Sequence, residues 1–208
     1  MTDTARAASE LHLPVLDETG RATLFYDARS ANSFSSEPVT DEELEEIWEM
    51  AKWPPTSANT QPLRVLYVRT PDGKARLLEH IADGNKAKTA AAPAVAVLAV
   101  DLDFHEHTST TFPIRPEMEK AFAEDQDRRH TTARFNAILQ AGYFLLAIRA
   151  AGLAAGPMAG FDADGVDGEF FPDGRFHTIL VVNIGHPGES PWFDRLPRLD
   201  NDTALQWA

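Results

Sequence analysis

Hydrophobic residues recur at helical spacing in the stretch that follows residue 40. Four of them fall on one face of a helix: Leu44, Ile47, Trp48 and Ala51. Thr40 and Glu43 form a capping box that would begin this helix. The pair Pro54-Pro55 would end it, because proline cannot continue a helix. The pattern therefore predicts an amphipathic helix between these two signals.

The longest periodic segment, residues 131–153, predicts a helix of about 20 residues. It is apolar around most of its circumference, which is typical of helices in a core or in a subunit interface. Ala137, Ala141 and Gly142 are small enough to let another backbone approach closely. Gly152 is expected to end the helix.

Three segments predict β-strands. Residues 63–70 alternate between apolar and polar positions, as in a strand with one face in water. Residues 90–100 and 176–185 are apolar runs suited to strands covered on both faces. A turn at residues 71–73 and then a short helix are expected to follow the first strand. Short strands and helices at uneven spacing indicate an α+β fold rather than a regular βαβ array.

The remaining segments carry weaker patterns. Residues 1–20 are expected to form an N-terminal arm, and residues 186–208 a tail with little structure before a turn of helix near its end. Residues 103–131 mix histidine, acidic, proline and aromatic residues, which indicates a partly exposed loop with a short helix. Residues 23–29 predict a first core helix, with two residues facing inward: Leu24 and Phe25.

Composition narrows the possible functions. The 208 residues fit one domain, and neither a repeat nor a linker divides residues 1–208. A formal net charge of −13 disfavours nucleic acid and anionic membranes as partners. The sequence has no cysteine, which excludes disulfides, thiolate metal sites and a cysteine nucleophile. With no 18-residue apolar run and no signal peptide at residues 1–10, the protein is expected to be cytoplasmic.

Two segments combine small, kinked and polar residues beside apolar elements. Residues 54–62 offer short hydroxyl and amide side chains, and residues 156–162 offer backbone groups that nothing bulky shields. Either segment alone is equally consistent with an ordinary loop. Together with nearby basic residues they suggest a site where a flat, polar-edged ligand such as a flavin lies against the main chain.

The positions of the few basic residues are informative because the chain is strongly acidic. Arg29, followed by Ser30, would be a phosphate clamp or a solvated arginine at a helix end, and Arg198 has the same two interpretations. Asn85 and Lys88 would share a helix face, where a cation could stabilise a reduced flavin, or Lys88 could be an ordinary surface residue.

Other chemistries find little support. His105 and His107 are two residues apart without a third metal ligand at a recognised spacing, so no metal site is expected. The chain lacks the Gly-x-Gly-x-x-Gly motif of a dinucleotide fold. Ser57 is not within a Gly-x-Ser-x-Gly elbow, which argues against a hydrolase nucleophile.

Six motifs in order make the chain similar to the FMN-dependent nitroreductase family, and within it to the malonic semialdehyde reductases (3-hydroxypropionate dehydrogenases) of pyrimidine breakdown. The motifs span residues 24–199. They are Asp27-Ala-Arg-Ser30, Lys52-Trp-Pro-Pro-Thr-Ser-Ala-Asn-Thr-Gln-Pro62, Gly84-Asn-Lys-Ala-Lys88, Gly156-Pro-Met-Ala-Gly-Phe-Asp162, Asn183-Ile-Gly185 and Arg195-Leu-Pro-Arg-Leu199.

The resemblance implies a three-layer α/β/α architecture around a central mixed, mostly antiparallel sheet. It also implies a homodimer with two FMN molecules bound in its interface. The C-terminal segment would be exchanged with the partner subunit, and residues 103–131 would form a lid over the substrate.

Carried over by motif, the resemblance assigns roles to individual residues. Arg29, Ser30 and Arg198 would hold the FMN phosphate, with Arg195 as the alternative to Arg198. Asn85 and Lys88 would meet the ribityl chain and the pyrimidine edge. Three residues would arrive from the partner subunit: Thr56, Ser57 and Asn59. Four would lie along the flavin, the last three of them at its N5 atom: Pro157, Met158, Ala159 and Gly160.

Two features depart from the family pattern. Many members carry a second basic residue shortly after the first arginine, where this chain has Ser33. Residues 103–131 contain no motif that maps onto the family's lid. A carboxylate substrate would need a cation there or nearby, and the candidates are Arg64, Arg115, Arg128 and Arg129.

The resemblance implies ping-pong hydride transfer from NADH or NADPH, through FMN, to a small-molecule acceptor. Malonic semialdehyde is the expected acceptor, and no catalytic side chain is required because the hydride chemistry takes place on the cofactor. One alternative is a broad nitro- or quinone reductase that uses the same flavin. The other is a non-catalytic dimer that holds flavin.

Overall fold

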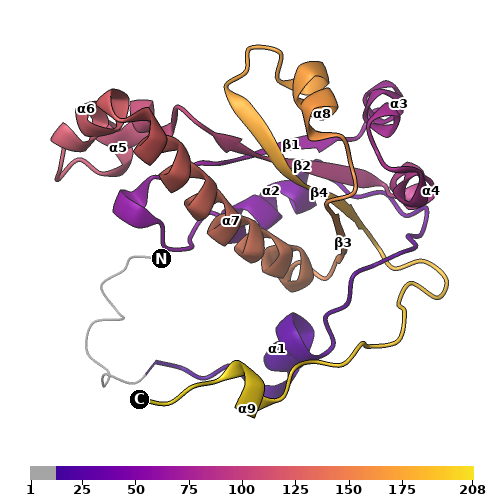
Figure 1. Ribbon diagram of the computed structural model, residues 1–208. Helices are drawn as coiled ribbons and strands as arrows, with labels where there is room; N and C mark the ends of the chain where they lie inside the picture. The colour runs from indigo at the N-terminus through magenta and orange to yellow at the C-terminus, as the bar shows by residue number, and fades with distance from the viewer. Residues whose placement is uncertain (1–12) are drawn as a thin grey trace.

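A four-stranded sheet forms the centre of the protein in a computed structural model, which describes residues 13–208 (Figure 1). The strand order is β1-β2-β4-β3, where β1 is Leu63–Val68, β2 Ala94–Asp101, β3 Ala154–Met158 and β4 Phe176–Gly185. All pairings between these strands are antiparallel, so the sheet expected to be mixed is antiparallel within the single chain. The predicted α+β class is confirmed. Of the predicted N-terminal arm, residues 1–12 lie outside the described residues.

Strand β2 is buried along its whole length and supplies side chains to two hydrophobic cores. Ala96 and Leu98 face one core, whereas Val95 and Val97 face the other. Such two-sided burial explains why this strand is a continuous apolar run in the sequence. Helices therefore cover both faces of the sheet, as the three-layer prediction requires.

One face is covered by α2 (Asp41–Ala51) and α7 (Gln126–Ala150). The capping box of α2 is present as predicted, with Glu43 N donating to the Thr40 hydroxyl at 3.1 Å. Helix α7 begins five residues earlier than predicted, because the Asp125 carboxylate accepts a hydrogen bond from Arg128 N and caps it. It ends where predicted, at Gly152, whose φ is +80°.

The opposite face is covered by α3 (Pro71–Glu79), α4 (Asp83–Ala91) and α8 (Ala163–Phe170). The turn predicted at residues 71–73 is instead the first turn of α3, since Thr70 caps the helix and Pro71 begins it. The strand predicted from residue 90 begins only at Ala94, because residues 90–91 still belong to α4.

Residues 103–131 are more helical than predicted. They contain the 3₁₀ turn η4 (Phe104–His107), the helices α5 (Thr108–Thr111) and α6 (Glu117–Glu124), and the start of α7. The rings of Phe104 and Phe122, both buried, meet at a centroid distance of 5.0 Å. This contact fastens the helices to the end of β2.

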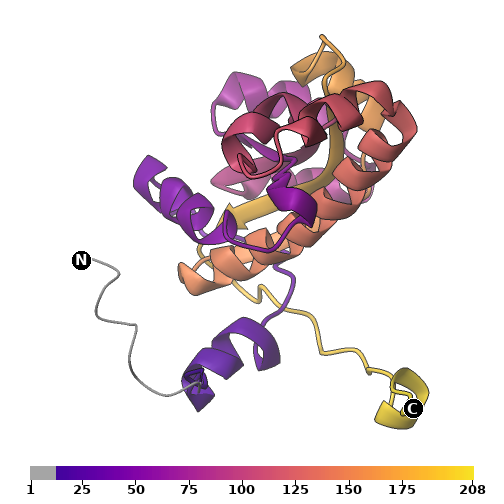
Figure 2. The same cartoon turned by 90° about the vertical axis from the view of Figure 1, so that its left-hand side faces the viewer.

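The segment from residue 13 to Tyr26 and the tail after β4 lie outside the layered body (Figures 1 and 2). The predicted core helix at residues 23–29 is wrong: α1 (Glu18–Arg21) and the π-helical turn η2 (Ala22–Tyr26) contain no buried residue, and Phe25 is 53% exposed. The tail after β4 is extended until α9 (Asn201–Ala204), as predicted. Among residues 13–208, no helix is both long and apolar enough to span a membrane.

Candidate functional site

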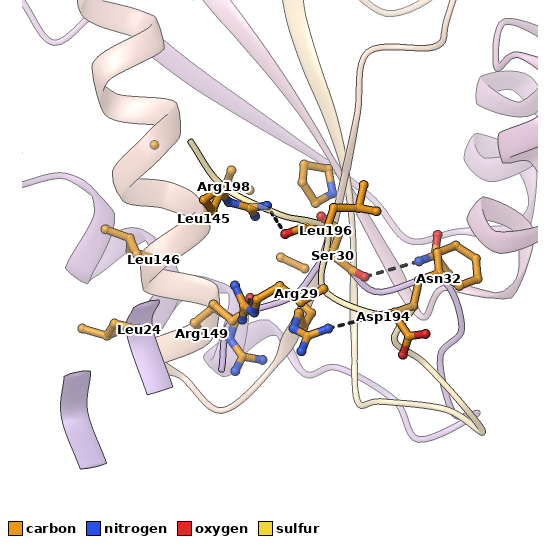
Figure 3. Close-up of a pocket in the computed structure, with 16 residues that line it drawn as sticks. Leu24, Arg29, Ser30, Asn32, Leu145, Leu146, Arg149, Asp194, Leu196 and Arg198 are labelled. Atoms are coloured by element: carbon orange, nitrogen blue, oxygen red, sulfur yellow. Dashed lines mark hydrogen bonds between the residues drawn. The ribbon is translucent and has the colours of Figure 1, made fainter. Parts of the chain in front are cut away.

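A cavity of about 490 Å³ lies where the C-terminal half of α7, strand β3 and the tail converge (Figure 3). Its apolar wall is formed by α7 and the residues that face it: Leu24, Gly142, Leu145, Leu146, Ala155 and Phe193. The rest of the lining includes four arginines. The residues that complete the cavity are Ala28, Arg29, Ser30, Asn32, Arg149, Pro157, Asp194, Arg195, Leu196 and Arg198.

The four arginines of this cavity donate hydrogen bonds to backbone carbonyls. Arg29 Nη1 donates to Phe193 O at 2.8 Å, and Arg195 Nη2 donates to Ala28 O at 3.1 Å and to Tyr26 O. Arg198 Nη1 donates to Leu196 O at 2.9 Å. Within residues 13–208, none of the four has a carboxylate within 4.0 Å. The cavity therefore gathers positive charge in a chain whose net charge is −13.

The residues predicted to hold a phosphate come together here. Arg29, Ser30 and Arg198 line one cavity although they are far apart in sequence, and Arg195 lines it too. Arg29 Nε is buried without a hydrogen-bond partner, so a phosphate would be bound by the Nη groups of this arginine.

A second group of predicted residues meets between α4 and the end of β3. Asn85 Nδ2 donates to Gly160 O at 3.2 Å, and Gly160 O also accepts from Ala82 N at 3.0 Å. Ala159 and Gly160 are exposed, as access to a ligand requires, while Met158 is buried. Lys88 lies half-buried on α4. Residues 156–162 were predicted as a loop, but Gly156, Pro157 and Met158 belong to β3, where proline is tolerated because the strand is an edge.

The third group, the loop that contains Thr56, Ser57 and Asn59, does not line the cavity. Ser57 N donates to Asn136 Oδ1 at 2.8 Å, and Asn59 Nδ2 donates to Thr111 O at 2.7 Å. Asn136 and Arg149 are separated by 13 helical positions on α7, which correspond to about 20 Å at 1.5 Å per residue. The loop and the cavity of one chain therefore lie at different places along α7.

Left-handed backbone gives this loop its shape. Ala58, Asn59 and Gln61 have φ values of 50°, 51° and 44°, which residues other than glycine adopt only where their surroundings impose it. The hydrogen bonds from Ser57 and Asn59 hold this conformation. The loop therefore presents its short polar side chains from a fixed position.

The nitroreductase family model matches residues 27–186 of this chain. The chain belongs to the nitroreductase family. A relative in Streptomyces coelicolor is 58% identical over 94% of this chain and 97% of its own, and it carries the provisional name NADH dehydrogenase/NAD(P)H nitroreductase. A Streptomyces griseus protein with the same provisional name is 48% identical over 92% of this chain and 97% of its own.

Solved structures share the fold of this nitroreductase at lower identity. A provisionally named nitroreductase from Exiguobacterium sibiricum, solved in complex with FMN, superposes with a TM-score of 0.79. It is 20% identical and covers 94% of this chain, which in turn covers 99% of it. At that identity the likeness shows the fold alone.

Sequence reasoning missed two residues of the nitroreductase cavity. Ser33, where a second basic residue was expected, lies outside the cavity and its hydroxyl donates to Glu189 O at 2.7 Å. The neighbouring Asn32 lines the cavity instead. Arg149 was missed because an arginine in the last turn of a helix is ordinary on sequence grounds. Only the packing of the tail against α7 reveals it.

Residues 103–131, expected to form a lid, are anchored by a buried carboxylate. Asp101 is fully buried and accepts hydrogen bonds from Arg64 Nη2 at 2.7 Å and from Arg175 Nε at 3.0 Å. Burial lowers the pKa of Arg64, and the charge of Asp101 partly offsets that effect. Hydrogen bonds to Asp101 and Glu106 raise the pKa of Arg175. Because arginine remains protonated in proteins, both side chains bind Asp101 as ion pairs.

Of the four cations proposed for a carboxylate substrate, three are occupied. Arg64 is bound to Asp101, Arg115 to Glu117, and Arg129 to the backbone of Leu102 and Phe122. Arg129 also lies 3.3 Å from a carboxylate oxygen of Asp103. Within residues 13–208, Arg128 has no carboxylate within 4.0 Å, and its guanidinium lies 5.2 Å from the centroid of the Phe122 ring.

Proposed function

We propose that this nitroreductase is an FMN-dependent NAD(P)H oxidoreductase. The observation that carries the proposal is the cavity of four arginines without carboxylate partners, which contains the residues expected to hold the FMN phosphate. The names of the Streptomyces relatives and the FMN complex of the Exiguobacterium protein support it. Bound FMN would supply reversible hydride acceptance and donation.

The residues of the chain fit the parts of this cofactor. A phosphate monoester carries between one and two negative charges at neutral pH and accepts several hydrogen bonds, which Arg29, Ser30 and Arg198 would donate. Asn85 and Lys88 would meet the ribityl chain and the pyrimidine edge. The short side chains at Ala159 and Gly160 leave the backbone there accessible to a flat ring.

We further propose a homodimer built on α7. Four exposed hydrophobic side chains follow one another along this helix at helical spacing: Phe135, Ile138, Leu139 and Tyr143. Such a continuous apolar face is unusual on the surface of a monomer. If two copies pack these faces in antiparallel fashion, the Ser57 end of one α7 approaches the Arg149 end of the other. This arrangement would bring Thr56, Ser57 and Asn59 to the partner's cavity.

The C-terminal segment would complete the dimer. Strand β1 is an edge of the sheet, and beside it lies a groove of about 770 Å³ between α2 and β1. Trp48 and Tyr67 form part of its apolar lining. The tail carries Leu205 and Trp207, and Trp207 is 90% exposed. We propose that this segment of one copy packs into the groove of the other. The tail would then cover the exposed edge of β1, and its own exposed apolar side chains would be buried.

Malonic semialdehyde is the proposed acceptor, with 3-hydroxypropionate as the product. The six-motif resemblance supports this choice, and Arg128 is a cation that could meet the substrate carboxylate. The reductant would be NADH or NADPH, which binds and leaves as a co-substrate. A broad nitro- or quinone reductase on the same flavin is the alternative, and its acceptors would not need Arg128.

The proposal is tested by purifying the protein and recording its visible spectrum. We expect a yellow homodimer that binds one FMN per chain and whose flavin absorbance is bleached by NADH or NADPH in stopped flow. Addition of malonic semialdehyde should then accelerate NADPH oxidation. Colourless protein that ignores added FMN would refute the flavin. A flavin that nicotinamides cannot bleach would indicate a non-catalytic flavin-holding dimer. Bleaching without acceleration by malonic semialdehyde would leave the broad reductase.

A further inference from the structure

Arg149 occupies the last turn of α7 and lines the same cavity as Arg29 and Arg198 (Figure 3). Its Nη2 donates to Thr23 O at 3.4 Å, and its guanidinium lies 6.0 Å from the ring centroid of Trp192. The helix fixes its backbone, while the η2 turn and the tail fix its guanidinium. The side chain is therefore placed by three separate elements.

Arg149 is half-buried, and within residues 13–208 it forms no ion pair, although Asp194 also lines the cavity. Arg149 Nε is buried without a hydrogen-bond partner, as is Arg29 Nε. In the part of the chain that the structure describes, none of the cavity arginines has a carboxylate within 4.0 Å. Buried N–H donors are almost always paired in native proteins, and neighbouring like charges repel. An anion bound by the Nη groups of these arginines would offset the repulsion.

An arginine at a helix C-terminus also interacts favourably with the helix dipole. That interaction explains a basic residue in the last turn, but it does not require Nε to be buried or the guanidinium to face a cavity with other arginines. A guanidinium has five N–H donors, and this one uses a single long hydrogen bond. Most of its donors are thus available to a ligand.

We propose that Arg149 is a further phosphate-binding residue of the cofactor site, acting together with Arg29 and Arg198. This assignment rests on the proposed function, because FMN is the phosphate-bearing ligand it invokes. Ser33, where a second basic side chain was expected, lies outside the cavity, and the neutral Asn32 lines it, so Arg149 would supply the missing charge from α7.

The test compares FMN with riboflavin, which lacks the phosphate, using flavin fluorescence titration of the full-length apoprotein. We expect Arg149→Ala to weaken FMN binding about 10- to 100-fold, as for loss of charge-assisted hydrogen bonds, and to leave riboflavin binding unchanged. Arg149→Lys keeps the charge but loses the planar fork, and it should weaken FMN binding less. The matched control is Arg76→Ala, an arginine of α3 outside the cavity and on the other face of the sheet, which should bind both flavins as the native protein does.

Equal FMN affinity in Arg149→Ala and the native protein would overturn the inference, and so would equal weakening for both flavins. If Arg149→Ala fails to fold, Arg149→Lys decides by the same comparison. If the native protein binds no FMN, the proposed function fails separately. The role of Arg149 is then tested by comparing the thermal unfolding temperature in inorganic phosphate with that in chloride at the same ionic strength. Stabilisation that Arg149→Ala abolishes would support an anion site, and stabilisation that it retains would overturn one.

Discussion

The contact between Asn85 and Gly160 shows how a single glycine can position a side chain of the proposed flavin site. These residues are 75 positions apart, and the bridge between Ile81 and Phe161 brings their segments together. A Cβ atom added to Gly160 would lie 2.7 Å from Asn85 Nδ2, which is far too close. A larger residue at position 160 would therefore force the Asn85 amide to move.

We expect Gly160→Ala to displace the Asn85 amide and to weaken FMN binding about 2- to 10-fold, the equivalent of one hydrogen bond. Folding should change little, because both residues lie at the surface. Flavin fluorescence titration measures the binding. Gly84→Ala is the matched control, since a Cβ atom there meets nothing within 4 Å. Unaltered FMN affinity in Gly160→Ala would show that Asn85 does not contact the cofactor.

A second prediction at the residue scale concerns Arg128 and the selectivity for the electron acceptor. Arg128→Ala should raise the KM for malonic semialdehyde about 10-fold or more, because the substrate carboxylate loses its cation, while the KM for a neutral quinone stays constant. Steady-state kinetics with both acceptors measure the difference. Arg115→Ala is the control, since Arg115 is already bound to Glu117. A parallel change for both acceptors would contradict a role in carboxylate recognition.

Elements are held together here by buried charge as well as by apolar packing. Asp101, at the end of β2, joins β1 through Arg64 and the segment before β4 through Arg175. Its Oδ1 atom also accepts from Asp103 N at 2.9 Å, where the lid region begins. Arg175 Nη1 also donates to Glu106 Oε2 of η4 at 2.7 Å. The orientation of residues 103–131, the proposed lid, thus depends on one carboxylate.

Asp101→Asn should lower the free energy of unfolding by about 3 kcal/mol or more, because it leaves two partly buried guanidinium groups without their shared counter-charge. Urea unfolding followed by circular dichroism measures the change. The control Glu124→Gln breaks an exposed pair with Lys120, which should alter stability by at most about 1 kcal/mol. A loss for Asp101→Asn as small as for the control would mean that the carboxylate is dispensable.

Local signals predicted some elements and could not predict others. The capping box at Thr40 and the apolar run of β2 each specify one structure, and both predictions are confirmed. Pro71 suits a turn as well as a helix start, so the turn predicted at residues 71–73 was wrong and α3 begins there. Strand β3 was missed because Gly156 and Pro157 are poor strand residues, tolerated only at an edge. The arginines of the cavity came from family motifs, whereas Arg149 needed the tertiary structure.

At the scale of the whole molecule, the single chain does not bring all the residues of the proposed site together. The cavity gathers Arg29, Arg149 and Arg198, but the loop around Ser57 lies elsewhere along α7. The predicted core helix at residues 23–29 is exposed, and so is one side of α7. A second copy is the economical explanation for all three observations, because one antiparallel packing of α7 would cover the apolar surface and complete the cavity.

The decisive variant for this assembly is Ile138→Glu, which places a charge in the middle of the exposed apolar face of α7. Ile138 is 63% exposed in the single chain, so the fold should survive. The proposed dimer should dissociate at least about 100-fold more readily, because a carboxylate would be buried there without a partner. Light scattering coupled to gel filtration measures the mass, and FMN should be lost with the dimer if residues of both copies hold it. Asp164→Lys on α8, across the sheet from α7, should leave mass and flavin content unaltered. A dimer of Ile138→Glu that keeps its flavin would place the interface, and with it the partner loop around Ser57, away from this face.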